Sequence, residues 1–551
     1  MPERRVLAAL ILLFSLLLFF ELPGSWLIEP DEARYAEIPR EMLATRDFVT
    51  PRLDSAHYFE KPPLLYWANA ASIATLGPSA FAARLPTRLA GIATVAMMIL
   101  VFGGSSDRDK DDRDLWGLWS ALIYVTAPLS WVLSRYNTTD AVLTFGMTLA
   151  FLALRSFLMR REAGKSATGV LALLGAGVAL ATLAKGLIGI VLPGLVFLIW
   201  MALTGRWRRL PELLLSPAPV VLLLLTVPWF VLVERANPGF ARIFFIREHF
   251  ARFATSEASR PGPVYYFVLV FLAGFLPWTF VSHRALVPLR DAWRARARAW
   301  SEEVFLALWF AVILVFFSLS RSKLIPYILP AFPAAAALAA RGVLRDASAS
   351  FRRPLWWHAW LVTAIGVGGV AYGVRSGEFA RYAVTAIACT GSAVMIALAW
   401  LAVMRARVTG RRALFPAALA WGAFYLMVIV AMPHVADDLS GHGVAVAARE
   451  AHARHVVSYK CYPQLLPWVL RHPIVVAAYT DELGSDGVRP PSLFWSGAEF
   501  WRRWRSGDPM VVVVKWRTLR EMADSTTFTT LAANRTYVVV SNLATSQSHG
   551  Q

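Results

Sequence analysis

The chain has 551 residues, of which 57% are hydrophobic and 17% charged, and its mean hydropathy is +0.51. A water-soluble globular protein rarely has so apolar a composition, so most of the chain is expected to lie in lipid. The net charge of +19 does not indicate nucleic-acid binding, because the basic residues form short clusters between long apolar runs. The only two cysteines, Cys389 and Cys461, exclude a disulfide framework.

The first apolar run, Val6 to Phe20, follows Arg4 and Arg5 and superficially resembles a signal peptide. No small-residue cleavage site follows it, and further apolar runs do. The run is therefore interpreted as a retained first helix.

Apolar runs long enough to cross a bilayer recur along the first three quarters of the chain. Because a spanning helix needs about 20 apolar residues, the sequence predicts about thirteen spans. They are expected to begin near residues 6, 82, 115, 138, 168, 186, 215, 264, 303, 324, 355, 380 and 413. Lys185 and Lys323 must each separate two neighbouring spans, because the uninterrupted runs would be too long.

Basic residues mark every second connection between these spans. The clusters are Arg4–Arg5, Arg108–Arg113, Arg160–Lys165, Arg206–Arg209, Arg290–Arg298, Arg341–Arg353 and Arg405–Arg412. Cytoplasmic loops carry an excess of Lys and Arg, so this alternation predicts a cytoplasmic N-terminus and an outer C-terminus. The long outer segments are then the first loop, 22–81, a second loop, 234–263, and the tail after about residue 433.

The tail contains four β-rich runs, separated by polar and helix-like segments, which predict a small α/β domain. They begin at His455, Pro473, Met510 and Thr536. The expected fold is thus an all-α polytopic membrane domain, residues 1–432, followed by a soluble α/β extracytoplasmic domain, residues 433–551.

The first outer loop opens with adjacent carboxylates, Asp31 and Glu32, in a charged amphipathic segment. A partly desolvated carboxylate there can position or deprotonate an acceptor, or bind a cation that neutralises a phosphate. An interfacial helix with ordinary solvated charges explains the same pattern equally well.

Further along this loop, Glu60 and Lys61 precede two prolines that fix the backbone. Lysine is a natural point-charge partner for a lipid phosphate. Tyr66 and Trp67 follow, and the favoured interpretation of these two is an aromatic belt at the membrane surface.

Three ionisable residues lie at the outer ends of predicted hairpins: Asp140, Lys185 and Lys323. Such residues at the edges of spans are candidates for function, although side chains there also snorkel to the interface. The basic turn at Lys323 lies on the side that the charge rule disfavours, which indicates an anionic ligand.

The second outer loop carries Arg252 and His249 in a segment, 240–253, with helical spacing of its apolar residues. Its basic residues are suited to covering a phosphate headgroup. A lone histidine is more often structural, and Glu60 with His249 supplies only two candidate zinc ligands, so spacing alone predicts no metal.

Several of these segments resemble the GT-C fold lipid-linked-sugar glycosyltransferases related to aminoarabinose transferase (ArnT) and the protein O-mannosyltransferases (PMT). The resemblance rests on Asp31 to Glu37, Tyr58 to Pro62, Asp140, Lys185, Arg247 to Phe250, and Lys323 before Pro326-Tyr327. These landmarks cover about the first 330 residues. The layout of spans and outer tail is also similar, whereas no motif in the tail matches.

The resemblance implies roles for individual residues. Asp31 becomes the main catalytic candidate, assisted by Asp140. The expected donor-phosphate residues are Tyr35, Tyr58, Lys61, Lys185, Arg252 and Lys323. The same resemblance implies a zinc ion at Glu60 and His249, structural or phosphate-orienting in character.

The function expected from this resemblance is transfer of a sugar from a polyprenyl (undecaprenyl) phosphate donor to lipid A or another envelope glycolipid. The enzyme would lie in the bacterial inner membrane and act on the periplasmic side. Transfer to a protein or polysaccharide, and a lipid-linked-sugar flippase, remain alternatives. No nucleotide-binding signature occurs in the predicted cytoplasmic loops, and no nucleic-acid partner is expected.

Overall fold

The computed structural model describes residues 2–103, 110–251, 261–294, 302–345, 351–375, 410–481, 483–484 and 488–542, with a few isolated positions between 390 and 401. Two compact units emerge. The helical unit comprises residues 1–20, 84–232 and 244–431. The mixed unit comprises residues 21–83, 233–243 and 432–551, and so combines the first outer loop with the tail.

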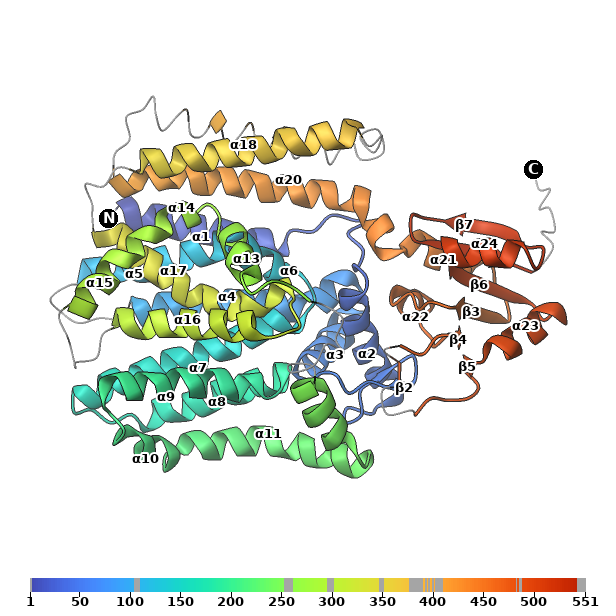
Figure 1. Ribbon diagram of the computed structural model, residues 1–551, viewed down its shortest axis with the longest axis horizontal. Helices are drawn as coiled ribbons and strands as arrows, with labels where there is room; N and C mark the ends of the chain where they lie inside the picture. The colour runs from blue at the N-terminus through green and yellow to red at the C-terminus, as the bar shows by residue number, and fades with distance from the viewer. Residues whose placement is uncertain are drawn as a thin grey trace. The chain divides into compact units, whose positions relative to one another are not determined.

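Helices account for the helical unit (Figure 1). Its elements are α1 (Pro2–Phe19), α4 (Ala80–Phe102), α5 (Lys110–Thr126), α6 (Pro128–Arg135), α7 (Thr139–Glu162), α8 (Thr168–Lys185), α9 (Ile188–Thr204), α10 (Arg209–Leu214), α11 (Pro217–Ala236), η1 (Arg242–Ala251), α13 (Tyr266–Gly274), α14 (Thr279–Ser282), η2 (His283–Ala285), α15 (Leu286–Arg294), α16 (Glu302–Leu319), η3 (Ile325–Ala331), α17 (Phe332–Arg345), α18 (Arg352–Arg375), η4 (Gly410–Ala413) and α20 (Leu414–Ser440).

Among the described residues, seven helices are long and apolar enough to cross a membrane, and nine if each of two bent pairs is one span. The seven start at or close to the predicted positions 82, 138, 168, 215, 303, 324 and 413. The bent pairs match the predictions near 115 and 264. The predictions near 6, 186 and 355 correspond to the helices α1, α9 and α18, and the run after 380 lies mostly outside the described residues. The count of thirteen is therefore not confirmed.

A proline explains the first bend. Helices α5 and α6 meet at 68°, and Pro128 is the first residue of α6. Because a proline disfavours helical backbone in the residue before it, Ala127 is extended (ψ 130°) and the span breaks there.

Helices α7 and α8 pack closely because small residues line their contact. A Cβ atom added to Gly146 would lie 2.6 Å from the backbone nitrogen of Ala181, and one on Gly177 would lie 2.5 Å from that of Ala150. Such positions let two backbones approach within a membrane domain. The short connection makes the pair antiparallel, so the start of α7 and the end of α8 lie at the same end of the hairpin.

In the mixed unit, the first outer loop supplies α2 (Asp31–Thr45), a short hairpin of β1 (Arg52–Leu53) and β2 (Ala56–His57), and α3 (Leu64–Leu76). The amide of Asn69 on α3 donates to the backbone oxygen of Tyr35 on α2 at 2.8 Å. This bond fixes the two helices of the loop against each other.

The tail folds as the predicted α/β domain. Its sheet has the order β5-β4-β3-β6-β8-β7. Strands β5, β4, β3 and β6 are parallel to one another, and β8 is antiparallel to both of its neighbours, β6 and β7. The elements are α21 (His442–Glu450), β3 (His455–Tyr459), α22 (Leu465–Leu470), β4 (Val475–Ala477), β5 (Phe494–Trp495), α23 (Gly497–Arg505), β6 (Met510–Lys515), α24 (Trp516–Ala523), β7 (Thr529–Ala533) and β8 (Tyr537–Ser541). The four predicted β-rich runs correspond to β3, β4, β6 and β8.

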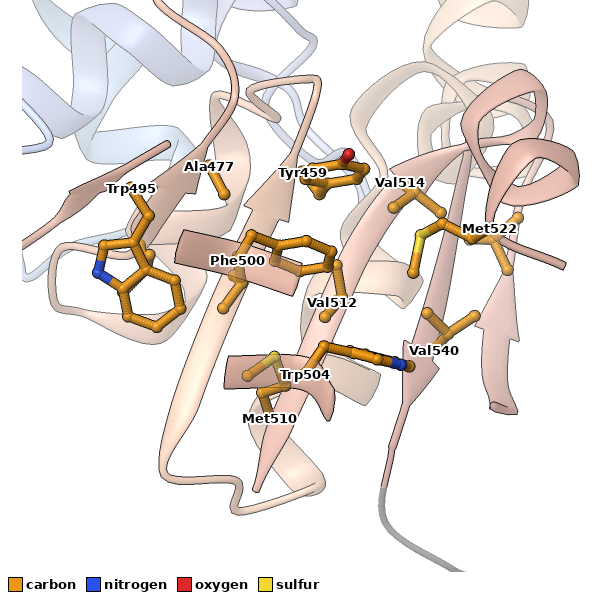
Figure 2. Close-up of a cluster of buried hydrophobic side chains, with 13 residues drawn as sticks. Tyr459, Ala477, Trp495, Phe500, Trp504, Met510, Val512, Val514, Met522 and Val540 are labelled. Carbon is orange, nitrogen blue, oxygen red and sulfur yellow. The ribbon is translucent and has the colours of Figure 1, made fainter. Parts of the chain in front are cut away.

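The core of this domain lies between the sheet and its helices. Phe500 and Trp504 of α23 pack with Tyr459 of β3 and Val512 of β6 (Figure 2). Residues 510–514 of β6 are buried without alternation, which is typical of a central strand covered on both faces.

Candidate functional site

Asp31 opens helix α2, where the positive end of the helix dipole favours a carboxylate. Its side chain is 49% exposed, whereas the side chain of Arg34, one turn later, is only 6% exposed. The nearest oxygen of Asp31 lies 3.7 Å from Nη2 of Arg34. Glu32 is turned the other way, since its buried carboxylate accepts from the backbone nitrogen of Ile28 at 2.9 Å. Asp31 is thus the member of the acidic pair that remains accessible to a substrate.

Three buried tyrosines surround Arg34. The guanidinium donates to the hydroxyl of Tyr58 at 2.8 Å, and the rings of Tyr35 and Tyr66 lie 6.0 Å apart. Burial raises the pKa of all three phenols well above the usual value, so each keeps its proton and can donate a hydrogen bond.

The aromatic-belt interpretation is wrong for Tyr66, because its side chain is completely buried. Among the described residues its hydroxyl has no hydrogen-bond partner. A rule based on neighbouring aromatic residues cannot separate a belt from an inward-facing ring, and only the packing of α3 against α2 reveals the difference.

Glu60 and Lys61 lie just before the prolines that lead into α3. The ammonium group of Lys61 donates to the backbone oxygen of Glu60 at 3.1 Å and lies 3.7 Å from its carboxylate. Both side chains are more than four-fifths buried. Partial burial strengthens the field of the lysine on any phosphate that reaches it.

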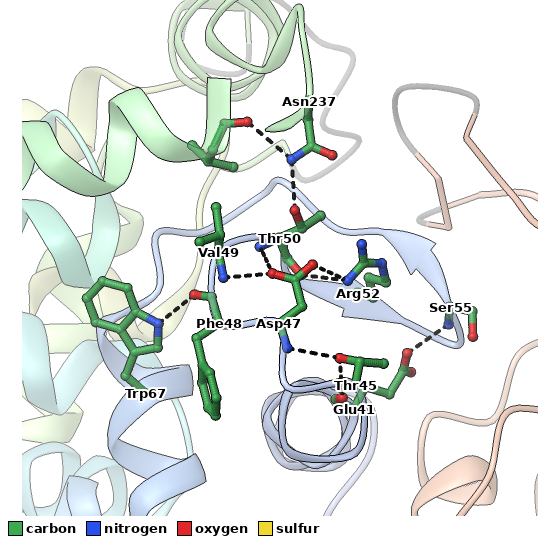
Figure 3. A network of polar contacts seen from close by, with 11 residues as sticks. Glu41, Thr45, Asp47, Phe48, Val49, Thr50, Arg52, Ser55, Trp67 and Asn237 are labelled. Atoms are coloured by element: carbon green, nitrogen blue, oxygen red, sulfur yellow. Dashed lines mark hydrogen bonds and ion pairs between the residues drawn. The ribbon is translucent and has the colours of Figure 1, made fainter. Parts of the chain in front are cut away.

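Polar contacts hold the loop that connects these parts (Figure 3). Asp47 accepts from the backbone nitrogens of Val49 and Thr50 at 3.0 and 3.1 Å and pairs with Arg52 at 2.6 Å. The hydroxyl of Thr50 accepts from Asn237 at 2.9 Å. The long loop is thereby an ordered scaffold.

The helical unit holds a second group of predicted residues. Asp140, at the start of α7, pairs with Lys185, at the end of α8, at 2.5 Å. The ammonium group of Lys185 also lies 4.7 Å from the centre of the Tyr327 ring. The antiparallel packing of the two helices brings these residues together, although they are 45 positions apart.

Lys323 is engaged differently. Its ammonium group donates to the backbone oxygens of Ser318 and Ser320 at 2.8 and 2.9 Å, next to the end of α16. A cation near a helix C-terminus stabilises the unpaired carbonyls there. The contact with these carbonyls explains the lysine at this position without any bound ligand. Phosphate binding by Lys323 stays a prediction.

The predicted residues therefore fall into two sets. Asp31, Tyr35, Tyr58, Glu60 and Lys61 lie together in the mixed unit, and Asp140, Lys185 and Lys323 lie in the helical unit. Arg252 and the side chain of His249 lie outside the described residues, and the predicted helix there is a π-helix, η1, over residues 242–251.

The predicted zinc site at Glu60 and His249 lies partly outside the described residues and stays a prediction. No group of three or more His, Cys, Asp or Glu side chains lies together among the described residues. Glu60 alone is too few ligands for zinc, which usually takes at least three from the protein.

Comparisons with known proteins match both ends of the chain. Residues 6–244 match the dolichyl-phosphate-mannose-protein mannosyltransferase (PMT) family, and residues 443–542 match the aminoarabinose transferase C-terminal domain. The fold is similar to the crystal structure of ArnT from Cupriavidus metallidurans bound to undecaprenyl phosphate. The similarity covers 98% of both chains, with a TM-score of 0.84 and 28% sequence identity.

Curated relatives include the undecaprenyl phosphate-alpha-4-amino-4-deoxy-L-arabinose arabinosyl transferases of Pectobacterium atrosepticum and Pseudomonas aeruginosa. The first is 34% identical over 65% of this chain, and the second is 35% identical over 60%. The matches span 62% and 58% of those relatives, which is less than two thirds of their length.

The chain is a polytopic membrane protein with the GT-C fold. This class is defined by the helical unit, the charged residues at its helix ends and the mixed α/β unit. Within that class, the chain is similar to the ArnT-like proteins over nearly its whole length.

Proposed function

We propose that this chain is an integral membrane glycosyltransferase that takes a sugar from undecaprenyl phosphate and transfers it to lipid A or a related envelope glycolipid. The observation that carries the proposal is the similarity over 98% of the chain to an ArnT structure that was solved with undecaprenyl phosphate. The match of residues 6–244 to the mannosyltransferase family supports the same class of donor.

The reaction would be a displacement at the anomeric carbon. The bond from that carbon to the lipid-phosphate oxygen breaks, an acceptor oxygen forms the new bond, and the configuration inverts. Charge develops on the departing phosphate, and fixed cations stabilise it. Lys61 and Lys185 are the proposed cations, with the protonated phenols of Tyr35 and Tyr58 as further donors; Arg252 and Lys323 are the remaining candidates.

Asp31 is the proposed catalytic carboxylate because it is the accessible acid of α2. If the acceptor is a hydroxyl, Asp31 takes its proton, and if the acceptor is a phosphate anion, Asp31 orients the acceptor or the sugar. Asp140 assists by holding Lys185 in place. Zinc at Glu60 and His249 remains an expectation from the family resemblance.

For location, we propose the bacterial inner membrane, with the N-terminus in the cytoplasm and residues 433–551 in the periplasm. The alternation of basic clusters along the sequence supports this orientation. The last segment of the mixed unit begins at Met432, which supports a boundary there between the membrane domain and the tail domain.

The decisive experiment measures transfer of radiolabelled sugar from synthetic undecaprenyl-phosphate donors to lipid A by the purified protein. Asp31→Asn and Lys61→Ala should abolish most transfer. Asp524→Asn and Lys460→Ala, which alter exposed residues of the tail, are the matched controls and should retain it.

Two results would redirect the proposal. Transfer to protein or polysaccharide but not to lipid A would replace the acceptor. Movement of labelled lipid between leaflets without any transfer, over a broad donor and acceptor panel, would favour a flippase.

A further inference from the structure

A cavity of about 470 Å³ lies within the mixed unit, apart from the residues discussed above. Its walls come from four segments: residues 21–27, residues 78–81, helix α21, and helix α22 with the following Arg471. The first segment directly follows α1, and Ala80 is the first residue of the span α4. The cavity is therefore built by the chain segments that enter and leave membrane helices.

Aromatic side chains form part of the wall. The Trp26 ring stacks on His442 with 3.5 Å between ring centroids and 2° between planes. Trp468 carries the guanidinium of Arg471 at 5.1 Å from its ring centroid. Aromatic rings of this kind are enriched where a protein meets lipid headgroups.

Two guanidinium groups, those of Arg449 and Arg471, border the cavity, and Glu21 is the carboxylate among its described lining residues. Arg471 donates to the backbone oxygen of Pro78 at 2.9 Å and is influenced by the charge of Glu37. The side chain of Arg449 makes no hydrogen bond or ion pair with the described residues, while its backbone oxygen accepts from the backbone nitrogen of His452. Both residues are exposed, although the charged group of Arg471 is partly desolvated by its surroundings.

These positive groups influence one another. Burial is the main reason that the pKa values of His442 and Arg471 lie below their usual values. Arg449 lowers the pKa of His442 against the opposing effect of Asp437. Arg40 and Arg449 lower the pKa of Arg471 against the opposing effect of Glu37. Among the described lining residues the two arginines outnumber the one carboxylate, Glu21, so the remaining positive charge favours an anion in the cavity. Arginine is suited to that anion when it is a phosphate, which it binds through paired hydrogen bonds.

We propose that this cavity binds the headgroup of an anionic phospholipid, with its phosphate between Arg449 and Arg471 and its glycerol portion against Trp26 and Trp468. The occupant is a lipid because the walls include the ends of membrane helices and the exposed ring of Trp26. The site is independent of the proposed transfer reaction, since none of its residues belongs to the candidate catalytic set.

The test compares lipid binding by the full-length protein in nanodiscs of phosphatidylglycerol with phosphatidylcholine, and in nanodiscs of phosphatidylcholine alone. Lipids that remain bound are counted by native mass spectrometry after release. Hydrogen exchange of the peptides covering 442–450 and 465–471 reports the location. Wild type should retain phosphatidylglycerol selectively and protect both peptides.

Arg449→Gln should lower retention of phosphatidylglycerol about five- to tenfold and remove the protection, whereas Arg449→Lys should retain part of it. Arg517→Gln removes the same charge from a side chain that is 94% exposed in the same domain, and should behave as wild type. Because Arg449 is exposed, its replacement is expected to leave the fold intact, which the melting temperature checks.

Equal retention of phosphatidylglycerol by wild type and Arg449→Gln would overturn the proposal. So would protection of both peptides by inorganic phosphate or glycerol phosphate in lipid-free detergent at the same concentration, because the site would then bind a soluble anion.

Discussion

The carboxylate of Asp54, in the first outer loop, accepts a hydrogen bond at 2.8 Å from the backbone nitrogen of Ile474, 420 positions later in the tail. Glu29 makes a similar connection, since its oxygens accept from the backbone nitrogen of Leu465 and the hydroxyl of Tyr537. These contacts join the tail to the loop that carries Asp31. The tail thereby supports the segment on which the candidate catalytic carboxylate lies.

Replacing Asp54 by Ala should destabilise the mixed unit by about 1–3 kcal/mol, because the amide of Ile474 would be buried without an acceptor. Asp54→Asn should be much milder. Asparagine retains one acceptor oxygen, and burial already raises the pKa of Asp54 well above its usual value, which favours the neutral form. Thermal unfolding in detergent measures both effects, with Asp524→Ala as the exposed control; equal melting temperatures for the two alanine variants would contradict the assigned contact.

The stability of the mixed unit should fall as the pH rises from about 5 to 8. Burial raises the pKa of Glu29 to about 7, and burial together with Glu37 raises that of Glu41 to about 8, although backbone hydrogen bonds act in the opposite direction. In the unfolded chain both groups lose their protons near their ordinary pKa of 4.5. The stabilisation that comes from these two protonated groups is therefore fully present below pH 4.5, and it is lost as the pH rises through their pKa values in the folded protein.

Melting temperatures measured across this range test the effect. Glu41→Gln should reduce the slope, because a glutamine has no proton to lose. A slope that is unchanged in Glu41→Gln and in Glu29→Gln would assign the pH dependence to other groups.

Gly146→Ala should destabilise the helical unit by about 1–3 kcal/mol, because the new methyl group would lie 2.6 Å from the backbone of α8. It should also lower transfer activity by moving Asp140 away from Lys185. Gly194→Ala is the matched control on α9, where an added Cβ meets no atom within 4 Å. Thermal unfolding of the two variants should differ clearly; similar melting temperatures would argue against the close packing of α7 and α8.

Asp140→Ala and Lys185→Ala should each lower kcat/KM about 100-fold or more, the usual magnitude for loss of one electrostatic stabiliser. The double variant should lose less than the product of the two effects, because each single change leaves a charged partner unpaired. A double-mutant cycle on the radiolabel assay measures this coupling. Strictly multiplicative effects would show that the two side chains act independently.

Tyr58→Phe and Tyr66→Phe remove the same atom with different expected results. Tyr58→Phe takes the acceptor from Arg34 and should lower the stability of the substrate-free protein by about 0.5–1.5 kcal/mol. Tyr66→Phe removes a hydroxyl that has no hydrogen-bond partner among the described residues, so the free energy of unfolding of the substrate-free protein should stay within about 0.5 kcal/mol of wild type.

Activity then separates two roles of Tyr66. A raised KM in Tyr66→Phe at unchanged stability would indicate a hydroxyl that contacts the donor or acceptor. Unchanged kinetics would restrict Tyr66 to packing.

Much of the candidate site could be predicted because its residues follow local signals. Asp140 and Lys185 stand at hairpin ends that hydropathy locates, and the antiparallel hairpin then brings them together. Tyr66 could not be interpreted in this way, since a belt residue and an inward-facing residue have the same neighbours in sequence. The short strands β5 and β7 were also missed, because a two-residue strand or a polar edge strand has no clear apolar run.

The sequence by itself determined the membrane class, the position of most helices and the four main strands of the tail. Hydropathy and β-propensity act within a few residues of each other, so they can be read along the chain. Only the tertiary structure decided that the first outer loop and the tail form one compact unit, and that Asp54 and Glu29 bind tail residues. Those contacts depend on the mutual packing of segments hundreds of residues apart, and no local pattern encodes which of many buried polar groups will meet.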